Sequence, residues 1–246
     1  MAGSANKPKG QAGVTVITCT NRKRQFKSIF QNFDRQRHAP KELIIVVNHD
    51  RIPLQPYLDL ANRCPNVRVY REPGRMPLGA CLNRAVRMAR YPYIAKFDDD
   101  DYYAPYYLTD ILQAFKRTGA DIVGKRTHYM YLKGSKSMIL RFRGNENRYV
   151  SILPGATLVV KRRVFDRVRF TGRRTGEDDQ FCRDSLRKGF KVYSAGKYNF
   201  VAIRRKNTAS HTWTMSDKDL LAHHVKIPRV RDYKRFVHRR PGGTKP

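Results

Sequence analysis

The chain has 246 residues, of which 51 are Lys or Arg and 20 are Asp or Glu, so its formal charge is +31. Hydrophobic residues make up 40% of the sequence and aromatic residues 11%. That is enough for a buried core, which excludes a disordered basic tail and favours one folded domain. So large a positive charge indicates a polyanionic partner: nucleic acid, an acidic glycan or an anionic membrane surface.

The sequence contains no run of about 18 apolar residues that could span a membrane, and its first 13 residues lack the apolar core of a secretory signal. We therefore expect a cytoplasmic protein. Its cysteines are widely spaced and form no C-x-x-C pair, which argues against a zinc ribbon and against a disulfide framework. We interpret them as reduced core thiols: Cys19, Cys64, Cys81 and Cys182.

In the first half of the chain the predicted elements alternate between strands and helices. Strands are predicted at 14–19, 42–47, 67–70 and 93–97, and helices at 26–33, 57–61 and 78–90. The alternation predicts an α/β fold with a parallel, doubly wound sheet. In such sheets ligands bind beyond the carboxyl ends of the strands. The residues just after Cys19, Val47 and Phe97 are therefore expected to hold a nucleotide.

The second half is less regular, and a basic segment stands at each end of the chain. Predicted here are helices at 105–117 and 178–188, a hairpin around 133–135 between strands 129–132 and 138–142, and strands at 121–124, 156–160, 190–193 and 200–204. Residues 1–13, rich in Gly, Lys, Ala and Pro, are expected to form a flexible basic arm. Residues 226–246 are expected to form a basic tail.

Seven of the 20 acidic residues lie in two short runs, 98–101 and 177–179. Adjacent carboxylates repel one another, so this crowding suggests a bound cation or a proton-transfer role. The alternative is a solvated acidic turn together with a helix amino terminus, where the helix dipole favours acids. For four aspartates directly after a buried strand we favour oxygen ligands for Mg²⁺ or Mn²⁺. For residues 177–179 both interpretations stay open.

An ordered set of segments resembles the family 2 glycosyltransferases with the GT-A fold. These segments are VTVITCTNR at 14–22, LIIVV at 43–47, GACLN at 79–83, YIAKFDDDD at 93–101 and GEDDQF at 176–181. The resemblance implies a mostly parallel central sheet flanked by helices, with a smaller mixed acceptor-side half. It also implies a nucleotide-sugar-binding half at 14–101 and an acceptor-binding, catalytic half of the same domain at 102–225. The implied reaction is an inverting sugar transfer from a nucleotide diphosphate donor.

The same resemblance implies a metal site and a general base. Asp98 and Asp100 correspond to the family's D-x-D motif, the first facing the ribose or the metal and the second the metal. The fourfold run leaves the register open by one residue, so Asp99 and Asp101 remain possible. His211 matches the place of a third metal ligand, although a lone histidine is more often structural.

The family's Glu-Asp motif assigns the general base to Asp178, with Asp179 as the alternative one position further on. Glu177 and Asp179 are also expected on the acceptor side of the site. Trp213 is a further acceptor-side candidate, as an apolar face for a sugar ring. A single tryptophan more often packs in a core.

The expected donor contacts include one departure from the family pattern. Where members usually have an aspartate that reads the nucleotide base, this chain has Asn48-His-Asp50. Asn48 can offer a donor and an acceptor to uracil, and Asp50 can take this role with a shifted loop, so we expect a UDP-sugar. The other donor-side candidates are Thr20, Asn21, Arg75 and Asn83. Arg75 could equally be an ordinary surface arginine, and Asn83 only a polar cap on its helix.

The competing hypothesis is a basic nucleic-acid-binding protein without catalytic activity. It rests on seven Lys or Arg residues within 161–174 and on the basic carboxy-terminal segment. The sequence contains no helix-turn-helix, zinc-finger or RNA-recognition signature, and acids at strand ends repel phosphates unless a metal covers them. Nucleic acid is therefore an unlikely partner. An anionic cell-envelope glycan, a lipid-linked acceptor or adhesion to the inner membrane face would also account for the charge.

Overall fold

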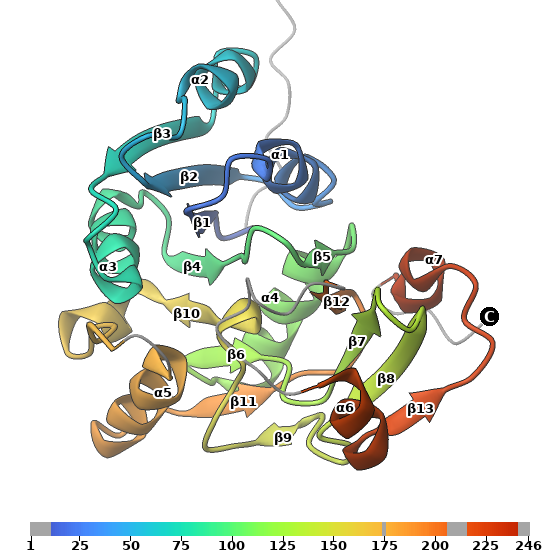
Figure 1. Ribbon diagram of the computed structural model, residues 1–246. Helices are drawn as coiled ribbons and strands as arrows, with labels where there is room; N and C mark the ends of the chain where they lie inside the picture. Colours follow the sequence, from blue (N-terminus) through green and yellow to red (C-terminus); the bar gives the residue numbers. More distant parts are fainter. Residues whose placement is uncertain (1–10, 174–175, 206–215, 241–246) are drawn as a thin grey trace, which may run out of the picture.

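The computed structural model describes residues 11–173, 176–205 and 216–240. Within them the main sheet has the strand order β3-β2-β1-β4-β10-β6-β11-β9 (Figure 1). Its strands are β1 (Val14–Thr20), β2 (Lys41–Asn48), β3 (Val67–Glu72), β4 (Tyr93–Lys96), β6 (Ile122–Gly124), β9 (Arg148–Tyr149), β10 (Val159–Lys161) and β11 (Val192–Ser194).

The first four strands form the predicted parallel sheet. β1 pairs in parallel with β2 on one side and with β4 on the other, and β2 pairs in parallel with β3. The chain adds strands outward from β1 to β3 and then returns to the opposite side of β1, so the strand order reverses between β1 and β4. In open α/β sheets the crevice beyond the carboxyl ends at such a reversal is the ligand site. Thr20 is the last residue of β1, and Asp98 lies two residues after the end of β4.

Both faces of the sheet are buried, as the apolar runs predict. The core on one face includes residues from α1 (Phe26–Asp34), α2 (Gln55–Ala61) and α4 (Tyr107–Thr118). The core on the other face includes residues from α3 (Leu78–Met88) and α5 (Glu177–Arg187). Adjacent residues of β2 alternate between the two cores, Ile45 in the first and Ile44 in the second, because successive side chains of a strand point to opposite faces.

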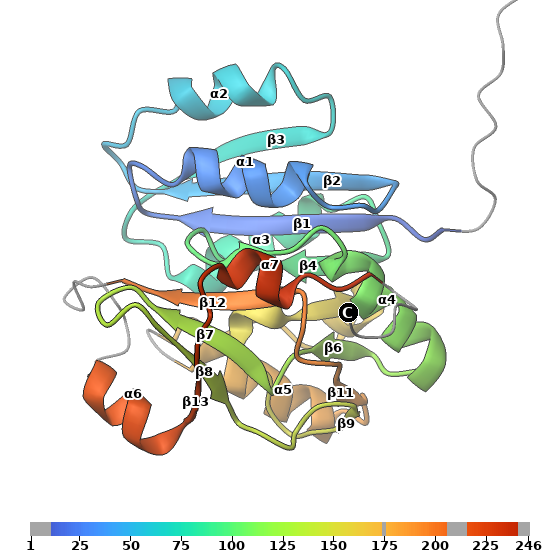
Figure 2. The same ribbon diagram turned by 90° about the vertical axis from the view of Figure 1, so that its right-hand side faces the viewer.

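A smaller sheet with the order β13-β8-β7-β12-β5 lies beside the main one (Figure 2). It contains β5 (Tyr102–Tyr103), β7 (His128–Leu132), β8 (Ser137–Arg141), β12 (Phe200–Arg204) and β13 (Val225–Ile227). All its pairings are antiparallel except that of β7 with β12. α7 (Tyr233–Val237) contributes Val237 to the core on one face, and α6 (Asp217–His223) contributes Leu220 to the core on the other. This second, mixed sheet agrees with the expected fold, although residues 102–225 also supply β6, β9, β10 and β11 to the main sheet.

The predicted basic tail begins inside β13 and takes part in the folded core up to Val237. β13 pairs with β8, and the Asn199 N–H donates to the Val237 carbonyl at 2.9 Å. The fully buried Val237 side chain fixes α7 against the smaller sheet. The last six residues of this segment and most of the predicted amino-terminal arm lie outside the described residues.

The predicted strand at 156–160 is wrong in its first half. Residues Gly155–Thr157 form a 3₁₀ turn, η1, closed by a hydrogen bond from the Thr157 N–H to the Pro154 carbonyl. The strand, β10, starts at Val159 and runs antiparallel to β4 and β6. A second 3₁₀ segment, η2 (Arg162–Asp166), follows it. Proline and glycine at 154–155 favour the turn over a strand.

Two expectations about the whole chain can be compared with the structure. All four cysteines are free thiols, and Cys81 and Cys182 are buried while Cys19 and Cys64 are half-buried. In the described parts of the chain no helix combines the length and the apolar character needed to cross a membrane.

Candidate active site

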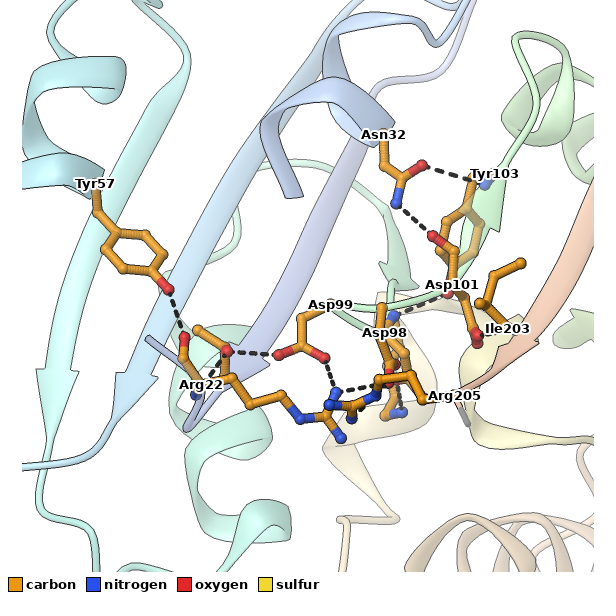
Figure 3. Close-up of polar contacts among 12 residues, drawn as sticks. Arg22, Asn32, Tyr57, Asp98, Asp99, Asp101, Tyr103, Ile203 and Arg205 are labelled. Atoms are coloured by element: carbon orange, nitrogen blue, oxygen red, sulfur yellow. Dashed lines mark hydrogen bonds and ion pairs between the residues drawn. The ribbon is translucent and has the colours of Figure 1, made fainter. Parts of the chain in front are cut away.

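The acidic run at 98–101 follows β4 directly, at the edge of the sheet where β1 also ends (Figure 3). The Phe97 N–H donates to the Ile17 carbonyl at 3.0 Å, which keeps the chain paired with β1 up to the run. The Phe97 ring stacks on the Tyr103 ring at 3.7 Å between centroids. The acidic run is therefore held beside the strand-order reversal between β1 and β4.

Asp99 points inward and is the most buried of the four. The Thr20 hydroxyl donates to its Oδ2 at 2.5 Å, and Arg22 Nη1 donates to its Oδ1 at 2.6 Å. Burial raises the pKa of Asp99 to about 6, with the nearby Asp100 carboxylate adding to the effect and Arg22 and Thr20 opposing it. This carboxylate joins the end of β1 to the acidic run.

Asp98 and Asp100 are more accessible, with side chains 38% and 16% exposed. Asp98 accepts a hydrogen bond from the buried Lys96 ammonium. Asp100 Oδ2 accepts from Arg22 Nη1 at 2.7 Å and from Arg205 Nη2 at 3.0 Å. Each of these two acids therefore has a basic partner from within the protein.

Asp101 has a structural position. Its Oδ1 accepts from the Ile203 N–H at 2.8 Å, and its carbonyl accepts from the Asn32 amide at 2.8 Å, so it links β12 and α1 to the acidic run. Burial raises the pKa of Asp101 well above its usual value. Of the two registers that the sequence leaves open, this arrangement favours the one with Asp98 and Asp100 in the site.

The residues present fit a divalent cation. In the described part of the chain, the contacts of Asp98 involve Oδ1 and those of Asp100 involve Oδ2, so a second oxygen of each can serve as a ligand. The same part of the chain contains no group of three His, Cys, Asp or Glu side chains arranged to hold a metal. Magnesium sites commonly use one or two carboxylates completed by waters and substrate phosphates, and two aspartates satisfy that pattern.

Asp178 lies in the first turn of α5 and is held by two backbone donors. The Gly155 N–H donates to its Oδ2 at 2.6 Å, and the Asp179 N–H donates to its Oδ1 at 3.0 Å. A Cβ added at Gly155 would lie 2.9 Å from the Asp178 Oδ2, closer than such contacts allow. The glycine at 155 lets the η1 turn approach this carboxylate and fix its orientation.

The buried Lys96 ammonium lies within electrostatic reach of both acidic runs. Burial alone would lower its pKa, but the carboxylates of Asp98, Asp178 and Glu177 raise it above its ordinary value. Burial in turn raises the pKa of Glu177. It also raises that of Asp179, where the Asp178 charge adds to the effect. Hydrogen bonds also connect the two acidic runs through the η1 turn: the Asp98 N–H donates to the Tyr103 hydroxyl, which donates to the Ala156 carbonyl, next to the Gly155 N–H that holds Asp178.

Asn48 and Asp50, which were expected to contact the nucleotide base, form hydrogen bonds with the loop that contains Arg75. Asn48 Nδ2 donates to the Pro73 carbonyl at 2.6 Å, and the Gly74 N–H donates to Asp50 Oδ1 at 3.2 Å. Arg75 itself is exposed, as is Asn21 in the loop after β1. These contacts position the loop beside the ends of β2 and β3.

Asn83 has both ends of its amide bound to one backbone segment. Its Nδ2 donates to the Phe170 carbonyl at 2.8 Å, and its Oδ1 accepts from the Phe170 N–H at 3.0 Å. These contacts tie α3 to the segment before α5, which favours the structural alternative over donor contact. His211 and Trp213 lie outside the described residues.

Sequence reasoning missed three basic residues of the site: Arg22, Lys96 and Arg205. Weak signals for them exist in the sequence. Arg22 follows the turn residues at the end of β1, Lys96 interrupts an apolar strand, and Arg205 directly follows β12. In a chain with 51 basic residues such signals do not stand out.

Carboxylates beside the strand-order reversal of an open α/β sheet are the arrangement expected of a protein that binds a small ligand beyond its parallel strands. Solved structures share the fold. The mannosyltransferase PcManGT from Pyrobaculum calidifontis, in complex with GDP-Man and Mn²⁺, has a TM-score of 0.63 and 18% identity, covering 81% of this chain and 59% of that one. S. aureus TarS 1-349, in complex with UDP-GlcNAc, has a TM-score of 0.60 and 16% identity, covering 85% and 63%.

The sequence matches the model of Glycosyl transferase family 2 over residues 15–166. The chain therefore belongs to this family, and it has the GT-A fold. Among curated proteins no sequence matches the chain. The chain spans about three fifths of the first of the solved structures that it resembles, TarS 1-349.

Proposed function

We propose that the protein is an inverting, metal-dependent glycosyltransferase that moves a sugar from a UDP-sugar to a hydroxyl of a glycan or glycolipid acceptor. The proposal rests on the interaction of Lys96 with carboxylates from both acidic runs. We assign Asp98 and Asp100 to the donor side of the site and Asp178 to the acceptor side. In this proposal residues 14–101 bind the donor, and residues 102–225 hold the acceptor and the base.

Each carboxylate set has one chemical role. Asp98 and Asp100 would hold Mn²⁺ or Mg²⁺, which when bound offsets the charge that grows on the leaving diphosphate. Asp178 takes the proton from the acceptor hydroxyl while that oxygen attacks the anomeric carbon from the face opposite the diphosphate. The two backbone N–H donors on Asp178 keep its carboxylate oriented for this task. Asn48, Asp50 and Arg75 shape the pocket for the base.

The first test is a thermal-shift measurement with UDP. UDP is expected to raise the melting temperature in Mn²⁺ or Mg²⁺ but not in chelator, because Asp98 and Asp100 without a metal repel the diphosphate. At a hundredfold excess over the dissociation constant, binding stabilises the folded state by about 2.7 kcal/mol. A GDP titration run in parallel tests the choice of nucleotide. Equal UDP shifts with and without chelator would contradict the metal role.

The acceptor is proposed to carry an anionic group. A hollow of about 370 Å³ is lined by Arg126, Asn145, Arg148 and residues 149–152, which lead directly to the Gly155 turn under Asp178. Burial lowers the pKa of Arg126, while the carboxylates of Asp179 and Asp178 raise it, so its guanidinium lies near the base. A phosphate or carboxylate on the acceptor would face this cation.

Transfer to a panel of neutral sugars and their phosphate esters tests this acceptor proposal. Arg126→Gln is expected to raise KM for phosphorylated acceptors about tenfold to a hundredfold, the worth of a hydrogen bond to a charged group, and to spare neutral ones. Arg143→Gln is the matched control, because Arg143 is exposed on the nearby turn. Equal use of neutral and phosphorylated sugars by the unaltered enzyme would contradict the proposal.

The excess positive charge fits the same proposal. We place the reaction in the cytoplasm, with peripheral contact to an anionic inner membrane face if the acceptor is lipid-linked. The alternative of a non-catalytic nucleic-acid-binding protein has no support from the site, where carboxylates lie beside the strand-order reversal.

A further inference from the structure

The side chain of Arg22 bridges two carboxylates of the acidic run. Its Nη1 lies 2.6 Å from Asp99 Oδ1 and 2.7 Å from Asp100 Oδ2, and its side chain is 27% exposed. Figure 3 shows the guanidinium reaching from the end of β1 to the acidic loop. Asp99 also has the Thr20 hydroxyl as a donor, whereas the contacts of Asp100 are to guanidinium groups.

The backbone of Arg22 is anchored independently of its side chain. Its N–H donates to Thr20 Oγ1 at 3.2 Å, and its carbonyl accepts from the Tyr57 hydroxyl at 3.2 Å. The Tyr57 side chain is fully buried in the core below α2. The loop can therefore keep its position while the long arginine side chain changes partners, which requires only rotations about its own bonds.

A divalent cation on Asp100 and a guanidinium on the same carboxylate repel each other. Bringing a cation to Asp100 therefore weakens the Arg22 contact, and a bound diphosphate offers that guanidinium an alternative anion. Arginine binds phosphate with two parallel hydrogen bonds, so the exchange replaces the Arg22 contacts with Asp99 and Asp100 by two contacts of the same kind. Asp99 keeps the Thr20 hydroxyl as a donor.

We propose that Arg22, beside Arg205, is a counter-ion of Asp100 in the nucleotide-free enzyme and turns to the diphosphate when metal and nucleotide bind together. This inference rests on the proposed function and adds a positioning and binding role for a residue of the β1–α1 loop. Arg22 then opposes metal binding in the absence of nucleotide and supports nucleotide binding in its presence. The two ligands consequently bind with positive coupling, and linkage requires this coupling to be reciprocal.

Mn²⁺ titrations of the whole protein, followed by the electron paramagnetic resonance signal of free Mn²⁺, test the proposal with and without UDP. Arg22→Gln is expected to bind Mn²⁺ at least fivefold more tightly without UDP. In saturating Mn²⁺ its UDP affinity is expected to fall at least tenfold. A merely structural role for Arg22 would weaken both ligands together. Arg24→Gln is the control, because it removes the same charge from an exposed position two residues away and should change neither affinity.

Arg22→Lys provides a second variant, which keeps the charge but lacks the planar pair of donors. It should bind Mn²⁺ within about twofold of the unaltered protein and still bind UDP more weakly. Mn²⁺ affinity that is unchanged or lower in Arg22→Gln, with the fold confirmed by circular dichroism, would overturn the proposal. If the unaltered protein binds no Mn²⁺ even with UDP, the metal dependence in the proposed function fails instead.

Discussion

Asp178→Asn is expected to reduce sugar transfer by roughly a hundredfold to ten-thousandfold, the usual worth of a positioned base, and to leave UDP binding nearly intact. The asparagine oxygen can still accept from the Gly155 N–H, which keeps the side chain near its place, but the amide cannot take the acceptor proton. The contact with the Asp179 N–H is lost, because the amide nitrogen is itself a donor. Steady-state transfer rates together with UDP thermal shifts measure the two effects separately.

Asp179→Asn is the matched control for this prediction. Asp179 lies in the same helical turn. It contacts Asp178 through its backbone N–H and not through its side chain, so the substitution keeps this contact. A small loss of activity is expected, since the nearby negative charge disappears but the base remains. A large loss in Asp179→Asn with little change in Asp178→Asn would move the base by one position.

Asp100→Asn is expected to abolish the metal-dependent part of the UDP thermal shift, which is several degrees for a protein of this size at hundredfold excess. A neutral amide is a poor ligand for a hard divalent cation, so the variant would lose the positive charge that a metal would offer to the diphosphate. Melting curves with UDP in Mn²⁺ and in chelator measure the difference directly.

Asp101→Asn separates the two possible registers of the acidic run. Its amide oxygen can still accept from the Ile203 N–H, and burial, which raises the pKa of Asp101, favours an uncharged side chain at this position. The metal-dependent UDP shift should therefore persist in Asp101→Asn. If it disappears there and survives in Asp100→Asn, the register Asp99 and Asp101 is the correct one.

The parts of the fold that follow local patterns could be predicted from the sequence. β2 is buried on both faces, and its unbroken apolar run is visible without any tertiary information. The resemblance of residues 93–101 to the family predicted the position of the acidic run in the site, because the strand and the aspartates are adjacent in sequence. The antiparallel insertion of β10 between β4 and β6 depends on contacts far along the chain, whereas proline and glycine at 154–155 were a local signal for the 3₁₀ turn.

The basic partners of the carboxylates could not be predicted in the same way. Arg22 is 77 residues from Asp99 in sequence, and Arg205 is 105 residues from Asp100. Only the closure of β1 beside β4, and of β12 beside β5, brings these pairs together. Such ion pairs depend on the three-dimensional packing of strands. In a chain with 51 basic residues, the sequence does not indicate which of them will contact the carboxylates.

The packing of β13 and α7 decides how the charge of the carboxy-terminal segment can be studied. Shortening the protein at residue 225 would remove most of β13, the strand that pairs with the edge of β8. It would also remove the buried Val237 side chain. An uncovered strand edge promotes association between molecules, so a shortened protein would be prone to aggregate. Neutralising exposed basic residues such as Lys226 and Arg231 to glutamine preserves this packing and changes only the electrostatics.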